Sequence, residues 1–89
     1  MNYDTEIKPI IISIIKEKLA ALSHEQWSGW MRYLFSKTVR NKNGTVTIPK
    51  WAVKRWERQA NSLYNELSEK EKQSDREEAD KVILIIKSK

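Results

Sequence analysis

The sequence predicts an all-α protein, a small three- to four-helix domain with a long first helix and an Asn/Gly loop or tiny β element at about residues 41–48. Three observations predict it. Apolar residues recur at helical spacing along most of the chain, both prolines precede such stretches, and one Asn/Gly cluster interrupts the pattern. Because 89 residues suffice for one modest core, we expect a single domain, 1–89.

The first helix is expected to run from about Pro9 to about Lys37. Its apolar stripe has spacings of three and four residues: Ile12, Ile15, Leu19 and Leu22. The sequence Ser23-His24-Glu25-Gln26 could be a capping box that starts a second helix. We favour one long helix, bent near Ser28-Gly29, since no proline or earlier glycine interrupts it.

The remaining elements follow from local chemistry. Asn41 to Gly44 is typical of a turn, and the β-branched residues 45–48 favour extended backbone, although a strand with no partner is not a sheet. Pro49 is suited to open a third helix, whose apolar face would be Ala52, Trp56, Ala60, Leu63 and Leu67. A capping box at residues 68–71 predicts the start of a last helix, which continues through Ala79, Val82, Ile83 and Ile86.

Charge is unevenly distributed along the chain. The net charge is +5, and residues 32–58 hold eight Lys or Arg against one acid, whereas residues 69–80 hold six acids against three bases. An anionic partner would therefore be attracted to the middle of the chain. The aliphatic run at residues 10–15 is too short to span a membrane, so we expect no membrane partner and a cytoplasmic protein.

The sequence offers little support for a catalytic site or a metal site. The chain has no cysteine and one histidine, and no carboxylates stand at ligand spacing, which argues against a metal site or another cofactor. It also has neither a Gly-rich phosphate loop nor a nucleophile motif. The sequence therefore predicts a binding protein and not an enzyme.

Four tryptophans are many for so short a chain. Trp56, in the middle of an apolar stripe, is expected in the core. Trp51 stands beside Lys50 and Arg55 at a helix start, where a ring and cationic groups could stack on and pair with a flat anion such as a nucleotide. A core position for Trp51 explains the pattern equally well.

Two further groups are candidates for ligand contact. His24 and Trp27 share a helical face, either as a ligand site or as a core histidine beside a packed ring. Trp27 and Trp30 bracket Ser28-Gly29, where a ligand or a neighbouring helix could approach closely. Asp75-Arg76, placed toward the apolar side of the last helix, would form an ion-pair network with Arg55 or Arg58, or bind a phosphate.

The residues quoted so far also carry a resemblance. Leu19-Ala20-x-x-x-His24-Glu25-x-Trp27 and Tyr64-x-Glu66-Leu67-Ser68-Glu69-x-Glu71-Lys72-x-x-Asp75-Arg76 resemble the RyR domain, a small helical repeat named after ryanodine receptors. The stretches His-Glu-Gln-Trp-Ser-Gly-Trp-Met and Ile-Pro-x-Trp-Ala-Val-x-Arg-Trp are similar to compact phage-encoded proteins. Residues 41–48 depart from the usual RyR turn. The resemblance implies a nucleotide-binding module in which His24, Trp27, Tyr64, Asp75 and Arg76 occupy shared positions.

Two function classes follow. The first is a non-catalytic protein, phage-encoded by resemblance, that sequesters a nucleotide-derived immune signal (a cyclic dinucleotide or an ADP-ribose derivative) in the host bacterial cytoplasm as an anti-defence sponge. It would bind a small anionic nucleotide-like ligand as a homodimer or higher homo-oligomer. The second is a phage accessory protein that binds nucleic acid or a host protein, although the acids of the last helix disfavour nucleic acid.

Overall fold

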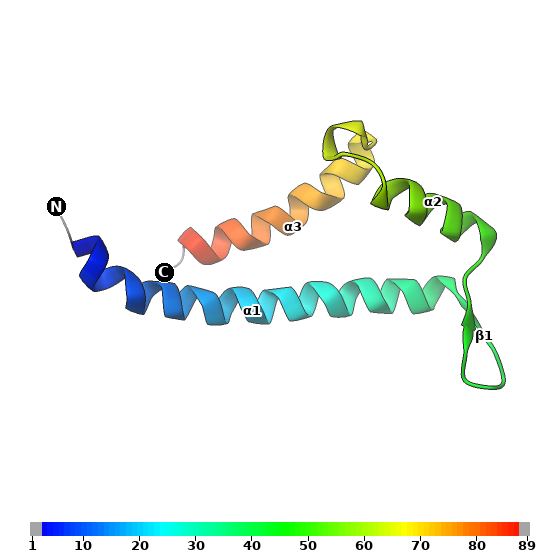
Figure 1. Cartoon of the computed structure of the whole chain (residues 1–89), viewed down its shortest axis with the longest axis horizontal. Helices are drawn as coiled ribbons and strands as arrows, with labels where there is room; N and C mark the ends of the chain where they lie inside the picture. The colour runs from blue at the N-terminus through cyan, green and yellow to red at the C-terminus, as the bar shows by residue number, and fades with distance from the viewer. Residues whose placement is uncertain (1–2, 88–89) are drawn as a thin grey trace.

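One long helix forms the spine of the molecule, which is described here from a computed structural model covering residues 3–87, with side chains from residue 9 onward. The elements, in chain order, are α1 (Tyr3–Lys37), β1 (Val39–Arg40), β2 (Val46–Thr47), α2 (Lys50–Ala60), the 3-10 helix η1 (Tyr64–Glu66) and α3 (Glu69–Lys87). The helix α3 returns antiparallel to α1, while α2 and the hairpin lie at the far end (Figure 1). The predicted fold class, all-α with a long first helix and a tiny β element, is therefore confirmed.

The helix α1 is continuous, as favoured from the sequence, but it begins earlier. It includes Pro9 instead of starting there. Pro9 lies beyond the first turn of the helix, where its ring nitrogen cannot donate to the preceding turn, so one backbone hydrogen bond is missing there. The segment Ser23–Gln26 stays helical, so the capping-box interpretation of these residues is wrong.

The hairpin combines the predicted turn and tiny β element with a partner strand, residues 39–40, that was not predicted. Asn41 N–H donates to the Thr45 carbonyl at 2.8 Å, and the Asn43 side chain accepts from the Thr45 N–H at 3.1 Å. Gly44 adopts φ 89°, a conformation that glycine reaches without steric cost. The strands pair antiparallel with Val39 opposite Thr47, so the β-branched stretch does find a partner in the residues that follow α1.

The helix α2 ends earlier than its apolar periodicity predicted. Asn61 Nδ2 donates to the Glu57 carbonyl at 2.9 Å, and Ser62 Oγ donates to the Arg58 carbonyl at 2.6 Å. Polar side chains that bond to the last carbonyls of a helix compete with further helical hydrogen bonds. Leu63 consequently lies outside α2 and is 68% exposed, which corrects its assignment to the apolar face.

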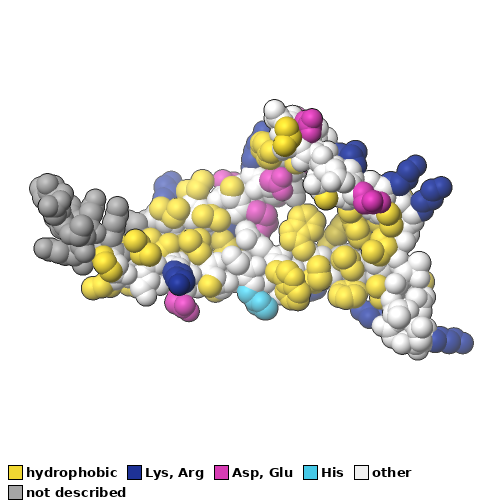
Figure 2. Space-filling view, viewed as in Figure 1, with side chains coloured by type: hydrophobic (Ala, Val, Ile, Leu, Met, Phe, Trp, Pro, Cys, Tyr) yellow, Lys and Arg dark blue, Asp and Glu magenta, His cyan; other side chains and the backbone are white. Residues whose placement is uncertain are grey.

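The chain is elongated and leaves much apolar surface open. It measures 59 × 34 × 19 Å and has a radius of gyration of 18.3 Å, against about 12 Å for a compact domain of this length. Among the side chains of residues 9–87, the buried apolar ones are Leu22 on α1 and Ala52 on α2. Large apolar side chains gather instead on the surface of α1, α2 and α3 (Figure 2).

Candidate binding groove

An open groove of about 1190 Å³ lies between the three helices and is the candidate site. It occurs where α3 diverges from α1, and α2 forms its third side (Figure 1). The lining residues that carry aromatic or charged chemistry are Glu25, Trp30, Arg32, Tyr33, Arg55, Trp56, Arg58, Lys70, Glu71, Asp75, Glu78 and Lys81. Its volume is large enough for a ligand of drug or nucleotide size.

Aromatic rings form the wall shared by α1 and α2. The ring centroids of Trp30 and Tyr33 are 6.4 Å apart at 86°, and those of Tyr33 and Trp56 are 6.2 Å apart at 57°. Trp51 continues the series outside the groove, 6.3 Å from Trp56. These edge and tilted contacts are the favourable ones for aromatic pairs, and the one between Tyr33 and Trp56 attaches α2 to α1. Trp30 remains 55% exposed and can still be covered by a ligand.

The floor of the groove beside Trp30 is open. A methyl group built on Gly29 would have one neighbour within 4 Å in the part of the chain that is described, Nη2 of Arg32 at 4.0 Å. Because no other helix approaches this position, close helix packing does not explain the small residue here. The space beside Gly29 is instead continuous with the groove, which it lines together with Arg32.

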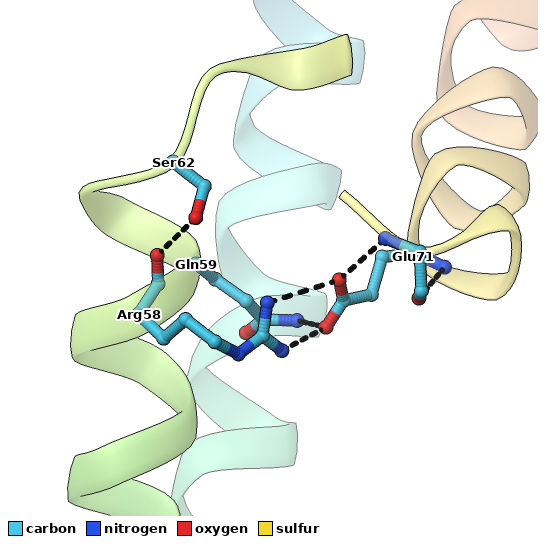
Figure 3. Close-up of polar contacts among 5 residues, drawn as sticks. Arg58, Gln59, Ser62 and Glu71 are labelled. Atoms are coloured by element: carbon cyan, nitrogen blue, oxygen red, sulfur yellow. Dashed lines mark hydrogen bonds and ion pairs between the residues drawn. The ribbon is translucent and has the colours of Figure 1, made fainter. Parts of the chain in front are cut away.

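A polar network closes the side of the groove formed by α2 and the start of α3 (Figure 3). Both terminal nitrogens of Arg58 donate to the Glu71 carboxylate, which also accepts from Gln59 Nε2 at 2.8 Å. Glu71 Oε1 accepts from the Ser68 N–H at 3.0 Å, and Ser68 Oγ accepts from the Glu71 N–H at 3.2 Å. The predicted capping box therefore exists, and Glu71 also joins α3 to α2.

This network changes the acidity of Glu71. The hydrogen bonds from Arg58 and from the Ser68 backbone lower the pKa of the Glu71 carboxyl from 4.5 to about 2. The carboxylate side chain is 17% exposed and that of Arg58 is 52% exposed, so the pair lies at the edge of solvent. Glu71 is consequently ionised at neutral pH and neutralises one of the groove's arginines.

Cationic groups without a partner remain on the groove. Within residues 9–87, no ion pair is found for Arg32 or Lys70, and Arg55 lies over the Trp51 ring at 5.0 Å. Lys81, by contrast, pairs with Glu78 at 2.9 Å. The exposed acids Glu25 and Asp75 line the same groove, and Asp75 is the one predicted from the sequence. The groove can therefore offer both phosphate-binding and hydrogen-bond-accepting groups.

The structure brings three of the nine sequence-predicted site residues to the groove: Trp30, Arg55 and Asp75. The other six lie elsewhere. His24 and Trp27 stack on each other on an outer face of α1, with centroids 6.1 Å apart, and Trp27 is 59% exposed. They do not line the groove.

The remaining four residues lie at two other places on the molecule. Lys50 and Trp51 are exposed at the start of α2, where the Trp51 ring lies between Arg55 and Trp56. Tyr64 and Arg76 do not line the groove either; Lys72 lies over the Tyr64 ring at 5.8 Å, outside it. The predicted residues are thus distributed over several surfaces.

The prediction for Asp75-Arg76 needs correction. Both residues are exposed, and Arg76 bonds to Glu69 on its own helix at 3.2 Å, which holds it away from the apolar side. The ion pair that joins the last helix to Arg58 uses Glu71 instead, one turn earlier. The capping-box pattern identified Glu71, but nothing in the sequence indicated that its carboxylate also faces Arg58.

Comparison with known proteins adds no assignment. No family model, curated protein or solved structure matches the chain, so the resemblance to the RyR domain stays untested. Over residues 3–87, no helix is sufficiently long and apolar to span a membrane. In the same part of the chain, no three His, Cys, Asp or Glu side chains cluster in a way that could hold a metal ion.

Proposed function

We propose that this protein binds a flat, anionic, nucleotide-like molecule in the groove between its three helices and does not transform it. One observation carries the proposal: exposed aromatic rings and unpaired cations line the same open groove. Trp30 would stack on a base, because stacking on an aromatic ring is tolerant of base identity. Arg32 and Arg55 would pair with phosphate oxygens, for which the planar guanidinium is well suited.

Acidic groups on the groove complement this arrangement. The ionised carboxylates of Asp75 and Glu25 can only accept hydrogen bonds, and ribose hydroxyls and exocyclic base amines can donate them. They would therefore orient the sugar or base while the arginines hold the phosphates.

The proposed identity of the ligand comes from the sequence resemblance. If the chain acts as the compact phage proteins suggest, the ligand is a nucleotide-derived immune signal, either a cyclic dinucleotide or an ADP-ribose derivative. Binding alone would suffice to inhibit a bacterial defence system, because a sequestered signal cannot reach its receptor. This step depends on the resemblance and not on the groove.

The direct test is calorimetric titration of the protein with cyclic dinucleotides, ADP-ribose, its cyclic isomers and AMP. Trp30→Ala should weaken binding about tenfold or more, because loss of a stacking ring costs about 1–3 kcal/mol. Trp27→Ala is the matched control, since Trp27 is equally exposed but lies outside the groove. Similarly, Arg32→Gln should weaken binding, whereas Arg40→Gln on the hairpin should not.

Two results would contradict the proposal. The first is the absence of heat with every nucleotide tested, together with no nucleotide released from the purified protein. The second is an equal effect of the Trp27 and Trp30 substitutions, which would place the ligand outside the groove. Mass spectrometry of the ligand after incubation distinguishes binding from catalysis, because a binding protein returns it unchanged.

A second candidate, nucleic-acid binding, rests on the cationic hairpin end. Residues 32–55 contain seven Lys or Arg and no acid, and the side chains of Arg40, Lys42, Lys50 and Lys54 are exposed there. Fluorescence anisotropy with single- and double-stranded oligonucleotides tests it, since phosphate contacts produce a steep loss of affinity with salt. Salt-independent capture of a host protein would favour the protein-binding variant of this candidate.

A further inference from the structure

One end of the molecule exposes aliphatic side chains on two helices at once. The N-terminal half of α1 and the C-terminal half of α3 lie antiparallel, with both chain ends nearby (Figure 1). We define the aliphatic patch as the exposed side chains Ile10, Ile12 and Ile14 of α1 and Ile83, Leu84 and Ile86 of α3. Ile10 and Leu84 are each 67% exposed.

These residues do not belong to the contact between the two helices. Half-buried side chains already form that contact, including Ile11 and Ile15 on α1 and Val82 and Ile85 on α3. Residues 82–86 are therefore apolar around the whole helix circumference, and within residues 10–15 only Ser13 is polar. A helix segment that is apolar on almost all sides is normally buried on almost all sides, and stretches of six and five residues are too short to span a bilayer.

The chain exposes more surface than a compact monomer of its size. A compact monomer of this mass exposes about 5,500 Å², whereas this chain exposes 7592 Å². The excess of about 2,000 Å² is spread over the whole elongated chain, and a second copy that covers half of it on each chain buries about 2,000 Å² in the dimer, which lies in the range of stable homodimers. The patch also contains only Ile and Leu, as in a domain core, and not the Tyr, Trp and Arg that are enriched in transient interfaces.

We propose that two copies of this chain associate through the aliphatic patch to form a four-helix bundle from two α1/α3 pairs. Two antiparallel helices cannot enclose a core, but two such pairs can. A shallow, mostly apolar groove of about 410 Å³ runs along α1 beside Ile12, Leu19, Ala20 and Ser23. The small side chains of Ala20 and Ser23 leave room for a helix or a large side chain of the second copy.

This inference is independent of the proposed ligand, since the patch and the nucleotide groove lie on different parts of the molecule. The patch residues are at the paired ends of α1 and α3, and none of them lines the three-helix groove. A protein that dimerises but binds no nucleotide would therefore contradict the proposed function alone. A monomer that binds nucleotide would contradict the dimer alone.

Sedimentation equilibrium of the full chain tests the proposal. The expected mass is about 21 kDa, twice the 10.6 kDa of one chain, and the melting temperature should rise with protein concentration. Leu84→Glu should shift dissociation by at least a hundredfold in Kd. Leu63→Glu is the matched control, because Leu63 is also highly exposed (68%) but lies in the loop after α2, and it should leave the mass unchanged.

A second measurement covers the case in which Leu84→Glu does not fold. Because the chain has no cysteine, Leu84→Cys and Leu63→Cys each introduce a single thiol. In the native protein the thiol at position 84 should react with a maleimide at least tenfold more slowly than the thiol at position 63, and dilution should abolish the difference. Equal rates overturn the proposal, as do a folded monomer at every concentration and an assembly larger than two copies. A monomer that binds phosphatidylcholine vesicles through Leu84 overturns it as well and assigns the patch to a lipid surface.

Discussion

The two ends of the molecule differ in how they cover their apolar side chains. At the hairpin end, the ring contact between Tyr33 and Trp56 joins α1 to α2, and Trp30 and Trp51 extend this series of four rings along their own helices. At the other end, α1 and α3 share one face, while the aliphatic patch stays open on the remaining faces. A large ring can contact a neighbouring helix that is not closely packed, whereas isoleucine and leucine are buried only when a helix packs directly against them.

This difference separates two roles. The hairpin end presents rings and cations to an open groove, which favours contact with a soluble anion. The opposite end presents the aliphatic patch, which favours a permanent protein contact. We therefore expect substitutions at the two ends to affect different measurements, and the following predictions test that separation from the largest effect to the smallest.

The largest effect is expected at Leu22, the one large apolar side chain that is buried between residues 9 and 87. Leu22→Ala should destabilise the protein by about 3 kcal/mol, because it removes buried methyl groups and leaves a cavity next to α3. Chemical denaturation measures it. Leu63→Ala at an exposed position should change stability by less than about 0.5 kcal/mol. Equal effects of the two substitutions would mean that α1 and α3 do not pack as described.

A somewhat smaller effect is expected at Ala52, which has no exposed surface and lies in α2. Ala52→Leu should destabilise by about 1–3 kcal/mol through overpacking. Because it displaces α2, the substitution should also weaken ligand binding in the groove while leaving the assembly mass unchanged. A change of subunit mass in this variant would show that the two ends are not independent.

The sequence predicted those elements whose signals are local. The turn at Asn41–Gly44, the start of α2 after Pro49 and the capping box of α3 each depend on neighbouring side chains and backbone, and each was found. The end of α2 was not predicted, because the apolar spacing continues to Leu63 and Leu67 although Asn61 and Ser62 terminate the helix. The spacing of apolar residues does not reveal that the side chains of Asn61 and Ser62 bond to the last carbonyls of the helix.

The candidate site was less predictable for a different reason. The helix α1 carries apolar residues on several faces, so spacing alone does not identify which face meets α2 or α3. His24 and Trp27 share a face with each other but not with the groove, whereas Trp30, three residues later, lines it. The role of Glu71 between α2 and α3 required the three-dimensional arrangement, since its partner Arg58 is 13 residues away.

The junction between the two ends provides a third prediction. Ser68→Ala removes the hydroxyl that accepts from the Glu71 N–H and should destabilise the protein by about 1 kcal/mol, the usual cost of losing an N-cap. Ser36→Ala is a matched control, because the Ser36 hydroxyl also bonds only to backbone, at 2.6 Å to the Tyr33 carbonyl, but caps no helix start. A loss as large in Ser36→Ala would contradict a specific capping role for Ser68.

The smallest effect is expected from the charge of Glu71, since its partner Arg58 is half exposed and solvent screens the pair. The pKa of Glu71 is about 2 in the folded protein against an ordinary value of 4.5, so the unfolded chain takes up the proton first as the pH falls. The stabilisation is therefore fully present above pH 4.5 and is lost as the pH falls from about 4.5 to about 2. Denaturation midpoints across this range should fall less in Glu71→Gln than in the wild type, and added salt should reduce the difference.

The control for this measurement is Glu78→Gln. Because the pKa of Glu78 is also lowered, chiefly by Lys81, this variant shows how much of the remaining pH dependence of stability comes from Glu78. If the pH profile of Glu71→Gln were identical to that of the wild type, the contact between α2 and α3 would not depend on this ion pair, and α2 would be attached to the molecule by its aromatic rings alone.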